Sequence, residues 1–115
     1  MKPIIGVVGP CAAGKTTLVS LLRQEGYEAR HIAQEHSYVA DMWRRLVHPD
    51  ILVYLHVSYA FTLSRRKMNW TQNEYEEQLY RLRHAKQHAD LYIETDSLTT
   101  EEVYNLVIQF VNQIN

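Results

Sequence analysis

The sequence is poor in several features that mark particular protein classes. It has one cysteine, Cys11, so a disulfide within the chain is excluded. Its longest apolar runs, at residues 4–8 and 51–55, are far shorter than the ~18 residues that a membrane-spanning helix needs. No pattern typical of a signal peptide is present. We therefore expect a cytoplasmic protein with no membrane partner.

An excess of one charge sign is also lacking. Twelve basic and thirteen acidic residues leave a net charge of -1, so no overall field attracts DNA or RNA. We expect no nucleic-acid partner, and any anion site must be local. With 46% hydrophobic residues and few glycines or prolines, the chain can bury a core. Residues 1–115 are therefore predicted to form a single domain, and assembly into a homo-oligomer stays open.

Apolar runs alternate with stretches of helical periodicity along the chain. The runs predict strands, and the periodic stretches predict helices. This alternation predicts an α/β domain, a three-layer sandwich with a mostly parallel, roughly four-stranded sheet. The expected strands lie at residues 4–8, 27–33, 51–57 and 90–94, and the expected helices at residues 15–25, 38–47, 58–68, 71–88 and from 99 onward.

Local signals refine the last two predicted helices. Thr71 with Glu74, and Thr99 with Glu102, have the spacing of capping boxes. In the last helix we expect five apolar residues to face the core, namely Val103, Leu106, Val107, Phe110 and Ile114. Ligands of parallel sheets bind beyond the carboxyl ends of the strands. The site is therefore expected along residues 9–16, 34–37, 58 and 95–97.

The most specific motif lies between the first strand and the first helix. Glycine, four residues, glycine, lysine and threonine follow one another there, as Gly9, Pro10, Cys11, Ala12, Ala13, Gly14, Lys15 and Thr16. Such a loop wraps backbone N–H groups around phosphates, and the positive end of the following helix points at them. In such a loop we expect Lys15 to neutralise the β and γ phosphates and Thr16 to offer a hydroxyl to Mg²⁺. Thr17 is the next candidate for nucleotide binding.

On this motif the chain resembles the P-loop NTPases, and its later segments resemble the nucleotide and small-molecule kinase branch. Residues 49–58 (PDILVYLHVS) are similar to the kinase strand that precedes the lid, with His56 where an aspartate is usual. The resemblance implies that ATP and Mg²⁺ are bound. It places Glu35 as a catalytic or metal-side carboxylate, and Arg65 and Arg66 as lid arginines that act on the phosphates. Thr95 and Asp96 become candidates for contact with the base.

Two functions of different classes stay open at this point. One is a compact kinase-like phosphotransferase that acts on a nucleotide or small molecule. The other is a nucleotide-binding sensor or assembly module that transfers nothing. The segment in which such kinases bind the acceptor is missing before Glu35. A substrate segment formed by residues 38–47, with Arg44 and Arg45, would favour the phosphotransferase, and a phosphate loop without space for an acceptor would favour the module. No guanine-type signature is present, so adenine is the default base. Cys11 is interpreted as filling a tolerant loop position.

Overall fold

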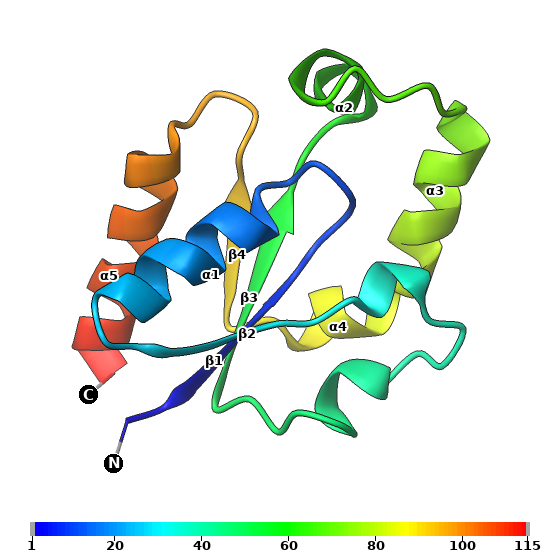
Figure 1. Ribbon diagram of the computed structural model, residues 1–115. Helices are drawn as coiled ribbons and strands as arrows, with labels where there is room; N and C mark the ends of the chain where they lie inside the picture. Colours follow the sequence, from blue (N-terminus) through cyan, green and yellow to red (C-terminus); the bar gives the residue numbers. More distant parts are fainter. Residues whose placement is uncertain (1, 115) are drawn as a thin grey trace.

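Four strands form the central sheet in the order β2-β1-β3-β4, and each neighbouring pair runs parallel (Figure 1). The computed structural model describes residues 2–114. Both faces of the central strands are apolar and buried, as parallel sheets require. The predicted α/β fold with a four-stranded parallel sheet is confirmed, although the second strand is shorter than expected. The strands are β1 (Ile4–Val8), β2 (Glu28–His31), β3 (Ile51–His56) and β4 (Leu91–Glu94).

Helices cover both faces of this sheet. On one face α1 and α5 lie against each other and pack on Val7, Val53 and Leu55, whereas α4 and Trp43 pack on the other face around Tyr54. None of the helices formed by residues 2–114 has the length and apolar character needed to cross a membrane. The described residues form α1 (Lys15–Gln24), α2 (Tyr59–Arg65), α3 (Gln72–Arg81), α4 (Arg83–His88) and α5 (Thr100–Ile114).

Two aspartates fix the register of the sheet at the amino ends of its strands. The Asp50 carboxylate accepts a hydrogen bond from Ile4 N (2.7 Å), and Asp50 N donates to Ile4 O (2.8 Å). Asp90 repeats this arrangement with Leu52 N and Leu52 O, each at 2.8 Å. Each aspartate directly precedes one strand and forms its hydrogen bonds with the strand beside it. β3 is thereby aligned with β1, and β4 with β3.

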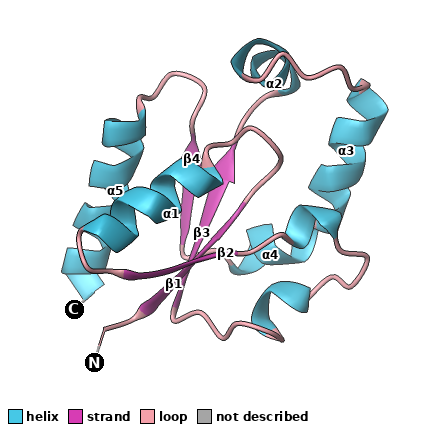
Figure 2. Cartoon of the chain, viewed as in Figure 1, coloured by secondary structure: helices cyan, strands magenta, loops and turns pink. Residues whose placement is uncertain are grey.

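The predicted helix at residues 38–47 is wrong. The connection between β2 and β3 contains only two short 3-10 turns, Gln34–His36 (η1) and Met42–Arg44 (η2), joined by loop (Figure 2). The cause is the fully buried Gln34 side chain, whose Nε2 donates to Val39 O (2.9 Å) and whose Oε1 accepts from Trp43 N (2.8 Å). These backbone groups bind a side chain in place of a helical partner.

Other predicted helices are present with different limits. Both capping boxes form, at Thr71 and at Thr99. The helix expected at 58–68 ends at Arg65, and the one expected at 71–88 is divided at the fully buried Leu82 into α3 and α4. On α5 the expectation was wrong for Leu106 and Ile114, which are 40% and 54% exposed. Packing against α1 turns Val111 inward instead, together with Val103 and Val107.

Candidate functional site

The two glycines of the 9–14 loop serve different purposes. Gly9 ends β1 with φ of 154°, and a Cβ there would lie 2.1 Å from Leu55 O on β3. A side chain is therefore excluded by the neighbouring strand. Gly14 has φ of 93°, and a Cβ at this position would have no heavy atom within 4 Å. The surface at Gly14 is open, so a ligand can approach the backbone closely there.

The amino end of α1 is left without a cap by its own sequence. No side chain accepts a hydrogen bond there, and its first turn has no acidic residue. The helix is ten residues long, so its N–H groups and dipole present a positive end to the surface beside Gly14. This arrangement favours an anionic ligand.

Lys15 and Glu35 form a buried ion pair at the centre of the site. Lys15 Nζ lies 2.9 Å from Glu35 Oε2, and the two side chains are only 5% and 4% exposed. The same ammonium donates to Gly9 O (2.6 Å) and Pro10 O (3.0 Å). Glu35 lies in η1, directly after the strand beside β1, as the sequence predicted. Its second oxygen, Oε1, is buried without a hydrogen-bond partner.

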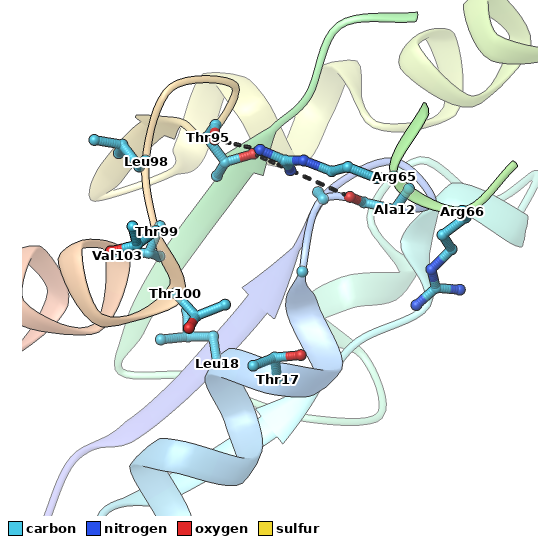
Figure 3. A pocket seen from close by; sticks show the side chains of 12 residues that line it. Ala12, Thr17, Leu18, Arg65, Arg66, Thr95, Leu98, Thr99, Thr100 and Val103 are labelled. Atoms are coloured by element: carbon cyan, nitrogen blue, oxygen red, sulfur yellow. Dashed lines mark hydrogen bonds between the residues drawn. The ribbon is translucent and has the colours of Figure 1, made fainter. Parts of the chain in front are cut away.

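Two cavities meet over the amino end of α1. The smaller one, of about 240 Å³, is lined by Lys15, Thr16 and Glu35, with Cys11, His31 and His36 around them. The larger one, of about 370 Å³, is lined by Thr17 and Leu18 of α1 and, after β4, by Thr95, Leu98, Thr99, Thr100 and Val103 (Figure 3). Ala12, Gly14 and Arg66 line both. The two cavities therefore adjoin at the carboxyl edge of the sheet, the edge at which ligands of parallel sheets bind.

Arg65 and Arg66, at the end of α2, differ in their surroundings. The Arg65 guanidinium donates to Thr95 Oγ1 (2.9 Å), Thr95 O and Ala12 O (3.4 Å), as Figure 3 shows. It thereby ties the end of α2 to the 9–14 loop and to the loop after β4. Among residues 2–114, no hydrogen bond or ion pair holds the Arg66 side chain, which borders both cavities. Arg66 is the arginine available to a ligand.

The candidates for contact with the base are also separated by the structure. Thr95 lines the larger cavity, and its hydroxyl donates to His56 O (2.8 Å). The Asp96 carboxylate accepts from Ser58 N (2.9 Å), where it holds the start of α2 and does not line either cavity. His56 stacks on Tyr92 with ring centroids 6.0 Å apart, and burial lowers the pKa of its imidazole. These contacts make His56 a packing residue.

Several residues of the site were not singled out by the sequence. Gln78 of α3 holds Cys11 at two points, because its Oε1 accepts from Cys11 N (3.0 Å) and its Nε2 donates to Cys11 Sγ (3.1 Å). His31 lies on the wall of the smaller cavity, where burial and then the charge of Lys15 lower the pKa of its imidazole. No local signal in the sequence connects position 78 with position 11.

Arg44 and Arg45, the arginines of the predicted acceptor segment, lie away from the cavities over α1. Both pair with Asp41, at 3.5 Å and 2.8 Å, and their side chains are about half exposed or more. Comparison of the chain with protein-family models and with curated proteins gives no match, so its function has to be argued from the geometry of this site.

Proposed function

We propose that the chain is a P-loop protein that binds ATP with Mg²⁺ and transfers the terminal phosphoryl group to a small molecule or nucleotide. The observation that carries the proposal is the buried Lys15 ammonium, held beside the uncapped amino end of α1 and facing a cavity. A fixed cation and unpaired helix N–H groups together bind phosphate oxygens. The phosphates would lie over Gly14, where the surface is open.

The larger cavity supports a base-binding role. Leu18, Leu98 and Val103 give it apolar walls, and the hydroxyls of Thr95 and Thr99 add polar groups. Its volume of about 370 Å³ is in the range of small-molecule sites. It continues directly from the smaller cavity through Gly14 and Arg66. A nucleotide can therefore extend from the smaller cavity into the larger one.

The residues of the smaller cavity also fit Mg²⁺. Magnesium prefers hard oxygen donors, and Thr16 and Glu35 supply a hydroxyl and a carboxylate on the same cavity wall. The Glu35 Oε1 atom is buried and lacks a partner, which a bound cation would provide. When bound, Mg²⁺ would neutralise charge on the phosphates. Glu35 would also be placed to orient or deprotonate an acceptor hydroxyl.

Space for an acceptor is present on the side of α3. A further cavity of about 430 Å³ shares His36 with the smaller cavity, and its other lining residues are Trp70, Asn73, Glu74, Glu77, Gln78 and Arg81. This favours phosphoryl transfer over binding alone. The segment 38–47 supports the second candidate, a sensor or assembly module, because it forms no acceptor-binding helix.

The test is a calorimetric titration with ATP and Mg²⁺. Lys15→Ala is expected to weaken binding by about tenfold to a hundredfold, since charge-assisted hydrogen bonds contribute roughly 1.5–3 kcal/mol. This change leaves Glu35 buried without its cation, so circular dichroism has to show that the variant is folded. Arg66→Ala is a second test of nucleotide binding, because the Arg66 side chain is exposed and its loss should leave the fold intact. Arg83→Ala on α4, which removes another exposed arginine, is the matched control. Unchanged affinity in folded Lys15→Ala and in Arg66→Ala would refute the nucleotide site.

Transfer is tested separately by ADP release with a panel of nucleosides, nucleotides and hydroxylated metabolites. A catalytic Glu35 predicts that Glu35→Gln binds ATP but releases little ADP, because the amide keeps a hydrogen-bond acceptor for Lys15 and loses the charge. Absence of release by the wild-type protein with every acceptor would favour the sensor or assembly module. Equal release by both proteins would remove Glu35 from the reaction.

A further inference from the structure

Three side chains around the smaller cavity come together in a way that nucleotide binding does not require. The Cys11 thiol, the Glu35 carboxylate and the His36 imidazole place one ligand atom each within 4.8 Å of the others. Cys11 Sγ lies 3.9 Å from His36 Nε2, and His36 Nε2 lies 3.8 Å from Glu35 Oε2. In a tetrahedral zinc centre with bonds of 2.0–2.3 Å, ligand atoms are roughly 3.3–3.7 Å apart. Small side-chain rotations would therefore complete the geometry.

An independent observation at Glu35 also points to a cation. Glu35 is only 3% exposed. Its Oε1 atom has no hydrogen-bond partner, whereas its Oε2 atom lies beside Lys15. A buried carboxylate oxygen without a donor is costly, and a metal ion removes that cost. The same carboxylate lines the cavity that Cys11 and His36 line. The carboxylate that faces His36 through Oε2 is therefore buried with its hydrogen-bonding capacity only partly used.

The sulfur of this cluster is held in place by α3. Gln78 Nε2 donates to Cys11 Sγ (3.1 Å), and Gln78 Oε1 accepts from Cys11 N (3.0 Å). Such outer partners orient the ligands of metal centres. The His36 side chain is 60% exposed, so it can turn toward the ion. One fixed ligand and one adjustable ligand suit reversible binding.

We propose that Cys11, Glu35 and His36 bind a divalent transition-metal ion of the Zn²⁺ class. Sulfur, nitrogen and carboxylate oxygen are the ligands that this class prefers, and three protein ligands leave one position open. When an ion is bound, the Cys11 thiolate and the Glu35 carboxylate would balance its two positive charges. Lys15 and Arg66 line the same cavity, so the open position favours an anionic ligand such as hydroxide or a phosphate oxygen. This inference goes beyond nucleotide binding and does not depend on it.

The test uses Co²⁺ and Zn²⁺ with the reduced, untagged protein, in excess Mg²⁺ and without nucleotide. One Co²⁺ per chain should produce a thiolate-to-cobalt absorption band in the near ultraviolet, and Cys11→Ser should lose it. In calorimetry with Zn²⁺, His36→Gln should bind more than about tenfold more weakly, the least that loss of even an outer group costs at metal centres. The exposed loop histidine His48 provides the matched control, and His48→Gln should bind Zn²⁺ as the wild type does.

Two results would overturn the proposal. One is the absence of a thiolate band in the wild-type protein, and the other is equal Zn²⁺ affinity in wild type and folded His36→Gln. Because no nucleotide is present, either result leaves the ATP titration to be judged separately. Circular dichroism shows whether each variant is folded.

Discussion

At the scale of single residues, the first glycine of the motif is required by close contact with β3, and the second by its positive φ. Gly9→Ala places a Cβ against Leu55 O at a φ that disfavours side chains, and should cost at least about 3 kcal/mol of unfolding free energy. Gly26→Ala is the matched control, because its φ of 87° is also positive but its nearest neighbour is the flexible end of Lys2. It should cost only about 1–2 kcal/mol. Urea unfolding measures both, and equal losses would contradict the argument.

The site residues divide by whether consecutive sequence determines them. The loop from Gly9 to Thr16 could be recognised because strand, turn and helix follow one another without interruption. Glu35 could be placed near Lys15 because the carboxyl ends of neighbouring parallel strands meet at one edge. Gln78 could not be assigned to the site, since its position depends on how α3 packs around the loop. Such packing has no periodic signature in the sequence.

At the scale of elements, the end of α2 contains two arginines with different tasks. Arg65→Ala removes hydrogen bonds to Thr95 and Ala12, and should lower stability by about 1–2 kcal/mol while loosening the loop after β4. Arg66→Ala should change stability by less than about 0.5 kcal/mol, as expected for an exposed residue without partners. Thermal unfolding compares the two variants. Similar melting temperatures for both would show that Arg65 does not tie these elements together.

Element prediction succeeded where hydrophobic periodicity determined the structure and failed where one buried polar side chain did. β1 and β3 are continuous apolar runs, so their limits were nearly correct. The segment 38–47 has a composition compatible with a helix, but the Gln34 amide binds Val39 O and Trp43 N and sets its path. The division of α3 from α4 at Leu82 likewise follows from its burial beside Tyr54 and Trp43. Neither effect is visible in local sequence.

At the scale of the whole molecule, stability should fall in mild acid. Burial is the largest cause that lowers the pKa of His31, His56 and His84 from the ordinary value of 6.5. The unfolded chain therefore binds protons at these positions before the folded chain does. The contribution of these neutral histidines to the free energy of unfolding is complete above pH 6.5. It is lost as pH falls from 6.5 through their lowered pKa values. The melting temperature should decrease over this window.

His84 allows this pH dependence to be assigned. Its Nδ1 accepts from Trp43 Nε1 (3.0 Å), a bond that requires the neutral ring. His88, Arg44 and Arg83 further lower its pKa, while Asp41 opposes them. His84→Gln should therefore have a shallower decrease in melting temperature between pH 7 and pH 5 than the wild type. An identical slope in the two proteins would show that groups other than His84 cause the pH dependence.

The aspartate bridges at the amino edge of the sheet make this fold modular. Asp50 aligns β3 with β1 whatever route the preceding residues take, and Tyr38 and Leu46 on that route are 84% and 82% exposed. Doubling the length of such a connection costs only about 0.6 kcal/mol in closure entropy. A further substrate-recognition unit can therefore be inserted at the exposed Leu46, beyond the buried Trp43 that packs on the sheet, while the register of the strands is kept. For protein engineering, the connection between β2 and β3 is therefore a position at which a further unit can be inserted.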